Sequence, residues 1–196
     1  AEKVIVEINT NLSQAFEGLH DIYIPTYRPT RQAIPLTQVD ERIGTHAINI
    51  DPAKIVGIVF NNELHDSPST VTAPDDETQA IASHLIAFFE KEVAEERLPK
   101  NLGPLQAGIG SIANAVLTGL KDSNFEDLIM YSEVLQDCTF ELIDAGKMKF
   151  ASGSSITLSA KYGEKVFNNL EQYKDKLVLR PQEISNHPEL VRRLGI

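Results

Sequence analysis

The sequence of 196 residues contains a single cysteine, Cys138. One cysteine excludes an internal disulfide framework and a zinc site built from cysteines, so we expect a reducing compartment, the cytoplasm. Long apolar runs are also missing, because IVGIVF at 55–60 is far shorter than the ~20 residues of a membrane span. No signal-peptide pattern is visible. We therefore expect no membrane partner.

An excess of positive charge is absent as well. Lys and Arg total 18 against 28 Asp and Glu, which gives a formal net charge of -10 at pH 7. Nucleic acids and anionic membranes bind clustered basic residues, so neither is an expected partner. The 5 histidines show no HExxH or comparable spacing, and we expect them in packing or surface positions. The sequence therefore predicts no metal site.

The beginning of the chain contains two short β-branched runs separated by irregular sequence. KVIVEIN at 3–9 and KIVGIVF at 54–60 are predicted as buried strands. Residues 10–52 lack periodicity and include several prolines, which indicates a long excursion that wraps a partner domain or lines a site. The polar stretch at 61–75 predicts a domain boundary.

The rest of the chain alternates between strand and helix patterns. Predicted strands are 105–109, 127–131, 148–151 and 177–179, and predicted helices are 75–97, 111–120, 135–145, 162–173 and a last one from 188. This alternation is typical of parallel βαβ units, so the predicted fold class is α/β with a parallel or mixed sheet. A strand pattern begins almost at Ala1, and we expect the chain to be a piece of a longer protein.

A glycine-rich turn, GIGSIA at 108–113, lies between a predicted strand and a predicted helix. Gly108 can adopt a positive φ, and Gly110 lets a ligand approach the backbone closely. The same turn fits the dinucleotide-binding fingerprint, in which Glu133 would bind the ribose. A tight turn without any ligand is the third interpretation. The turn alone leaves the three open.

The segment YSEVLQD at 131–137 resembles the catalytic glutamate segment of class I coenzyme A transferases. More narrowly it resembles the acetyl-CoA hydrolase/transferase family, which includes acetate–succinate CoA-transferases. Further matching segments are LPKNLGPLQAGIGSIANAVLTGL at 98–120, ELIDAGKMKFAS at 141–152, LRPQEISNHPELVRRLG at 179–195, KVIVEINT at 3–10 and PLTQVDERIGT at 35–45. The resemblance therefore covers nearly the whole chain in order.

The resemblance implies a CoA-transferase-like fold. Residues 1–64 would be the C-terminal part of a first α/β domain. Residues 65–196 would be the N-terminal part of a second α/β domain, which carries the catalytic glutamate. The complete enzyme would be a homodimer.

The resemblance also implies roles for particular residues. Glu133 would be the nucleophile that forms a glutamyl–CoA thioester, a form of covalent catalysis. Asn186 would donate a hydrogen bond to the oxyanion. An ordinary helix cap at the start of the next helix is the other interpretation, and the two roles do not exclude each other. The turn would contact CoA through Gly108, Ile109, Gly110, Ser111, Ile112 and Asn114. A second oxyanion donor of the family would lie beyond residue 196, so the isolated chain is expected to be inactive.

The implied reaction transfers CoA between an acyl-CoA, acetyl-CoA or succinyl-CoA, and a small carboxylic acid. CoA would be a substrate, and no permanently bound cofactor is expected. Acetyl-CoA hydrolysis is the alternative, because it differs only in water resolving the intermediate, and a Rossmann-type dinucleotide module is another. Cys138 is predicted to be buried and inert. The serine run at 152–155 lacks a GxSxG motif, which favours a loop beside the site.

Overall fold

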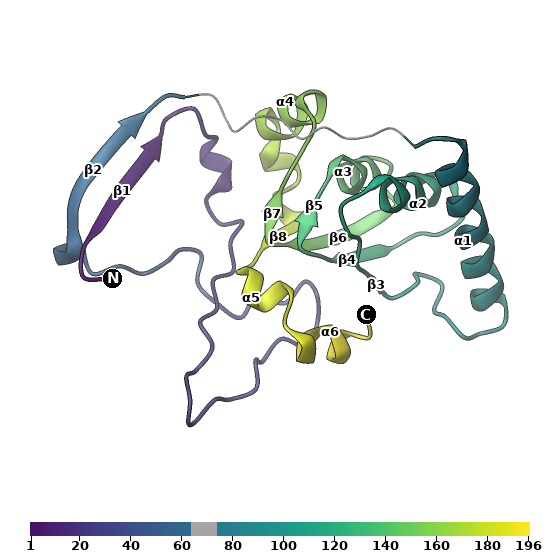
Figure 1. The fold of residues 1–196 in the computed structure, drawn as a ribbon, viewed down its shortest axis with the longest axis horizontal. Helices are drawn as coiled ribbons and strands as arrows, with labels where there is room; N and C mark the ends of the chain where they lie inside the picture. The colour runs from purple at the N-terminus through teal and green to yellow at the C-terminus, as the bar shows by residue number, and fades with distance from the viewer. Residues whose placement is uncertain (64–73) are drawn as a thin grey trace.

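The computed structural model describes residues 1–63 and 74–196. Its centre is a four-stranded parallel sheet (Figure 1). The strands, in spatial order, are β3 (Pro104–Leu105), β4 (Leu128–Tyr131), β6 (Met148–Gly153) and β8 (Leu177–Leu179). The connecting helices are α2 (Ser111–Asp122), α3 (Asp137–Asp144) and α4 (Ala160–Asn168). Neighbours in space are successive βαβ units, so the predicted α/β class is confirmed.

The helices begin where the local sequence favours a helix start. Asp75 precedes α1 (Asp76–Ala94), and its Oδ1 accepts a hydrogen bond of 2.8 Å from the Thr78 N–H. The predicted helix at 162–173 is divided instead, because α4 is followed by the 3₁₀ turns η3 (Leu170–Gln172) and η4 (Lys174–Lys176). No helix in the described part of the chain is long and apolar enough to cross a membrane.

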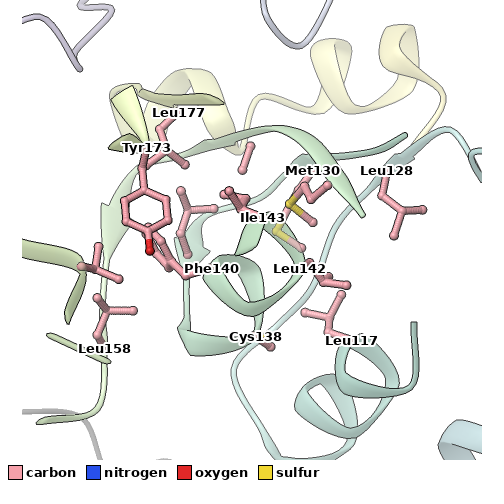
Figure 2. Packing of buried hydrophobic residues seen from close by; sticks show 14 of the residues in the cluster. Leu117, Leu128, Met130, Cys138, Phe140, Leu142, Ile143, Leu158, Tyr173 and Leu177 are labelled. Atoms are coloured by element: carbon pink, nitrogen blue, oxygen red, sulfur yellow. The ribbon is translucent and has the colours of Figure 1, made fainter. Parts of the chain in front are cut away.

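Both faces of the parallel sheet are covered. Leu128 and Met130 point from β4 into a core shared with α2 and α3 (Figure 2). Because side chains alternate along a strand, Ile129 and Tyr131 point to the opposite face. There they pack with α5 (Gln182–Ser185) and α6 (Pro188–Leu194).

The irregular excursion at 10–52 contributes to both cores. Ile34, Leu36 and Val39 are buried on the face of Tyr131, where they pack beside α5 and α6. Leu19 is buried in the other core, and the Asp21 N–H donates to the Leu179 carbonyl at 2.8 Å. A short 3₁₀ turn, η1 (Gln14–Phe16), lies next to this contact. The excursion therefore runs beside β8 and contributes side chains to both faces of the central sheet.

A second, two-stranded parallel sheet pairs β1 (Val4–Asn9) with β2 (Ile55–Asn61), and the 3₁₀ turn η2 (Pro52–Lys54) precedes β2. The two predicted strands are confirmed, but their predicted burial is wrong in this chain, since Ile5 is 68% exposed and Phe60 67%. Apolar patterning indicates that a strand packs and does not identify its partner. In the part of the chain that the structure describes, these two strands pair only with each other. The predicted domain boundary at 64/65 lies outside the described residues.

Two short strands extend the chain beyond the carboxyl ends of β4 and β6. They are β5 (Val134–Leu135) and β7 (Ser155–Ile156), which pair in parallel. The helix predicted at 135–145 therefore begins only at Asp137, and the strand predicted at 105–109 is reduced to β3. Ser132 and Glu133 occupy the junction between β4 and β5. This junction positions the candidate site.

Candidate active site

Glu133 lies at the carboxyl edge of the central sheet, where parallel α/β folds place their ligands. Its backbone carbonyl accepts hydrogen bonds from the N–H groups of Ser154 at 2.7 Å and Ser155 at 3.2 Å. The Ser132 N–H, one residue earlier, donates to the Ser152 carbonyl at 2.9 Å. The backbone on both sides of Glu133 is therefore fixed to the strand β6–β7, while its half-buried side chain projects from the edge.

Each oxygen of the Glu133 carboxylate accepts a hydrogen bond from a different side-chain amide. Asn186 Nδ2 donates to Oε2 at 3.0 Å, and Gln182 Nε2 donates to Oε1 at 2.6 Å. The structure therefore brings together the two residues for which the resemblance implied catalytic roles. Gln182 was not predicted, although it stands in the same matching segment, one helical turn before Asn186.

Asn186 caps a helix, but a different one from that predicted. It is the C-cap of α5, whereas the N-cap of α6 is His187, whose side chain makes no capping hydrogen bond. The prediction that Asn186 would cap the following helix is therefore wrong. The physical reason is that the chain forms a separate short helix at 182–185 before Pro188 starts the next one. The Asn186 amide is left free to bond Glu133.

Hydrogen bonds join the glycine-rich turn to the Glu133 segment. Ser132 Oγ donates to the Ala107 carbonyl at 2.9 Å, and Gln136 Nε2 donates to the Gly108 carbonyl at 3.3 Å. A pocket of about 440 Å³ lies between the two segments. It is lined by Gln106, Ala107, Gly108, Ile109, Glu133 and Val134. The predicted nucleophile and the first two residues of the turn thus face a common space.

The sequence allows a positive φ at Gly108, but the structure has it at the other glycine of the turn. Gly110, with φ +154°, has the positive φ, and Gly108 does not. Gly110 must turn the chain into α2, whereas Gly108 continues out of the extended segment after β3. A Cβ at either glycine would meet nothing within 4 Å, so both leave open space beside the backbone. That space suits the close approach of a ligand.

The remaining predicted turn residues divide into two groups. Ile109 is 74% exposed, Ile112 is 48% exposed, and Ser111 begins α2 without a side-chain cap before it. Asn114 is buried, and its Oδ1 lies 3.6 Å from the Cys138 Sγ, which donates to it. The Asn114 side chain is thus directed toward α3. Its contact with CoA stays a prediction.

Burial raises the pKa of Cys138 to about 12, since its thiol is desolvated against α2. The prediction of a buried, unreactive thiol agrees with this position. Burial likewise raises the pKa of Tyr131 to about 12, and its Oη donates to the Ile184 carbonyl at 2.7 Å. Within residues 1–63 and 74–196, no three His, Cys, Asp or Glu side chains are grouped to hold a metal ion.

No protein-family model matches the chain. Curated proteins named acetyl-CoA hydrolase are similar to it over its whole length. The Schizosaccharomyces pombe protein is 49% identical over 196 residues, that of Eremothecium gossypii 48% over 196 residues, and that of Neurospora crassa 49% over 200 residues. The chain spans only 37% of the length of each of these relatives.

Solved structures support the fold. RipA from Yersinia pestis superposes with a TM-score of 0.56 at 20% identity, over 74% of this chain and 31% of RipA. A 4-hydroxybutyrate CoA-transferase from Porphyromonas gingivalis superposes with a TM-score of 0.54 at 18% identity, over 97% of this chain and 39% of the transferase. The fold is therefore CoA-transferase-like. Along its entire length the chain is a homologue of the acetyl-CoA hydrolases, which confirms the family resemblance carried by its sequence motifs.

Proposed function

We propose that this chain carries the nucleophile of an enzyme that transfers CoA between an acyl-CoA and a small carboxylic acid, with Glu133 forming a glutamyl–CoA thioester. The observation that carries the proposal is the environment of the Glu133 carboxylate. Each of its oxygens accepts one amide hydrogen bond, and Glu133 lines a pocket together with the glycine-rich turn. An ordinary exposed glutamate at a strand end has no need of two dedicated amide donors.

The chemistry divides one transfer into two simpler steps. A carboxylate oxygen of Glu133 attacks the acyl carbonyl, the bond from carbon to sulfur breaks, and CoA leaves as a thiolate. The thiolate then attacks the Glu133 carboxyl carbon, and the acyl group departs as a free carboxylate. An incoming acid reverses both steps and leaves as the new acyl-CoA.

Asn186 supports these steps from the carboxylate side. When sulfur attacks the glutamyl carbon, negative charge develops on the oxygen that stays bound to that carbon. The Asn186 amide already lies 3.0 Å from Oε2, so it can stabilise this oxyanion without moving. Backbone groups of the turn at 108–112 would hold CoA beside Glu133. CoA acts here as a substrate, no permanently bound cofactor takes part, and the full-length enzyme acts as a homodimer.

Acetyl-CoA hydrolysis is the second candidate, and the names of the relatives favour it. Both reactions share the glutamyl intermediate and differ in whether water or a carboxylic acid resolves it. The acyl group best supported by these names is acetyl, with acetate or succinate as the acceptor acid in the transferase.

The proposal is tested by incubating the full-length protein with acetyl-CoA in the absence of an acceptor acid. Intact-mass analysis and peptide mapping should find a CoA-sized adduct on the Glu133 peptide, and added acetate or succinate should release it. Steady release of free CoA without an adduct would support the hydrolase. If no adduct forms and no acetyl-CoA is consumed, both the transferase and the hydrolase proposals are overturned. Dinucleotide binding would then be favoured, and titration with NAD would check it.

Glu133→Gln provides the decisive variant. It keeps the size of the side chain and removes the nucleophilic carboxylate, so we expect transfer to be abolished while the fold and the affinity for CoA persist. Circular dichroism and CoA binding by calorimetry control for the fold and the site. Turnover close to that of the unmodified protein would remove Glu133 from the nucleophilic role.

A further inference from the structure

The two amides that hold Glu133 come from one short segment. Gln182 is the first residue of α5, and Asn186 is its C-cap, so the two side chains leave α5 one turn apart. They reach different oxygens of the same carboxylate, Oε1 at 2.6 Å and Oε2 at 3.0 Å. The two oxygens of Glu133 are therefore not equivalent in this site.

Buried contacts hold α5, which carries these two amides, in place. Tyr131, two positions before Glu133, is fully buried, and its Oη donates to the Ile184 carbonyl inside α5 at 2.7 Å. Ile184 and Ser185 are buried as well, whereas Gln182 and Asn186 are exposed in this chain. The fold thus holds α5 against β4 through its inner face. The Gln182 amide makes its hydrogen bond to Glu133 from the exposed face of α5.

We propose that Gln182 is a further catalytic residue, which binds the oxygen of Glu133 that attacks the acyl group and later departs with the product acid. This inference rests on the proposed transferase chemistry. Asn186 donates to Oε2, so Oε2 is the oxygen that stays on the glutamyl carbon and bears the oxyanion. Oε1, held by Gln182, is then the attacking oxygen.

The bond changes show when Gln182 acts. In the first step Oε1 bonds to the acyl carbon as the CoA thiolate leaves, and Oε1 becomes the neutral bridging oxygen of an anhydride. In the second step sulfur bonds to the glutamyl carbon, and the bond from that carbon to Oε1 breaks. The electron pair of this bond returns to Oε1, which leaves as part of the product carboxylate.

A donor next to Oε1 is therefore most useful while this bond breaks. Negative charge develops on Oε1 in that transition state, and a hydrogen bond that strengthens with charge lowers its free energy selectively. The same donor assists the reverse step, in which an incoming acid attacks the thioester. Gln182 should thus control both the formation and the discharge of the glutamyl–CoA adduct, and have little effect on the binding of CoA.

The test uses the full-length protein with Gln182→Met, which has a similar size and shape but no donor, and Gln182→Glu, which places an acceptor against Oε1. Glu183→Gln is the matched control, because Glu183 is the next residue of α5, is exposed, and is not among the hydrogen-bond partners of Glu133. Rapid quench and mass analysis give the rates of adduct formation from acetyl-CoA and of its discharge by acetate. Thermal denaturation and the KM for acetyl-CoA are measured in parallel.

We expect Gln182→Met to lower both rates by about tenfold or more, with KM changed less than about twofold and the melting temperature unchanged. Gln182→Glu should be slower still, because it adds like charge to the loss of a donor, and Glu183→Gln should match the unmodified protein. Rates of Gln182→Met within about twofold of the unmodified protein would overturn the role of Gln182 and leave the transferase proposal intact. An unmodified protein that forms no adduct would overturn both.

Discussion

The ion pair between Asp21 and Arg180 should be one of the most costly interactions to break in this chain. Both side chains are almost fully buried, Arg180 at 2% exposure and Asp21 at 1%, and Arg180 Nη1 donates to Asp21 Oδ2. The second carboxylate oxygen, Asp21 Oδ1, accepts from the N–H groups of Ile43 at 3.0 Å and Gly44 at 2.5 Å. Asp21 thus neutralises a buried charge and also anchors the irregular excursion.

The other hydrogen bonds of Arg180 go to uncharged groups. Its Nε donates to Ser152 Oγ at 3.0 Å, and its Nη2 donates to the carbonyls of Val39, at 3.1 Å, and Glu41. Burial lowers the pKa of Arg180 and the Asp21 carboxylate opposes that shift, which indicates how much the guanidinium depends on its partner. Asp21→Asn keeps the shape of the side chain but leaves the buried guanidinium without the carboxylate that forms its ion pair.

We expect Asp21→Asn to reduce the free energy of unfolding by about 3–5 kcal/mol, the range for removing one partner of a buried pair. Glu189→Gln is the control, because it breaks the partly exposed pair with Arg193 and should cost at most about 0.5 kcal/mol. Urea titration of the full-length protein measures both through the shift of the transition midpoint. A loss of stability for Asp21→Asn no larger than that of the control would refute the reasoning that burial makes this ion pair costly to break.

Three further changes test the site and its surroundings. Asn186→Ala should lower kcat by about 10²-fold, because it removes a donor from the oxyanion; an unchanged rate would leave Asn186 as a helix cap only. Gly108→Ala fits the open space without backbone strain, so we expect it to raise the KM for acetyl-CoA through contact with the ligand; an unchanged KM would remove the turn from the CoA site. Gly110→Ala, at φ +154°, should in addition lower the melting temperature. Burial raises the pKa of the Cys138 thiol to about 12, so the thiol stays protonated well above pH 8. A thiol reagent at pH 8 should therefore label Cys138 only as the protein unfolds, and rapid labelling of the folded protein would contradict its burial.

The central sheet and its helices could be predicted because their signals are local. The helix start at Asp75 depends on a capping residue and an acidic first turn, and both are visible in the sequence. The apolar runs that became β4, β6 and β8 are short and separated by helical patterns, which is sufficient to indicate βαβ units. These features depend on residues within one turn or one strand of each other.

The exposure of β1 and β2 could not be predicted from such signals. Their sequences are rich in β-branched residues, yet Ile5 and Phe60 are exposed, and within the described residues each of these strands pairs with the other alone. The sequence also suggested a positive φ at Gly108, whereas Gly110 has it. A GxG pattern allows either glycine to turn, and the actual choice depends on where β3 ends, after only two residues. Both errors arise from the tertiary context of a correctly identified local feature.

The contact between Gln182 and Glu133 is neither a local feature nor wholly unpredictable, because a rule of sheet topology could have indicated it. Parallel strands have their carboxyl ends at one edge, so the residues after β4 and β8 must lie on the same side of the sheet. With β6 between them, the two strands are about 10 Å apart, twice the spacing of paired strands. The Glu133 side chain and the short helix α5 bridge that separation together, since α5 brings the amides of Gln182 and Asn186 within hydrogen-bond distance of the carboxylate. At position 182 the length of the side chain matters as well as its amide, because the same amide on the shorter asparagine would start farther from Oε1 than the glutamine amide does.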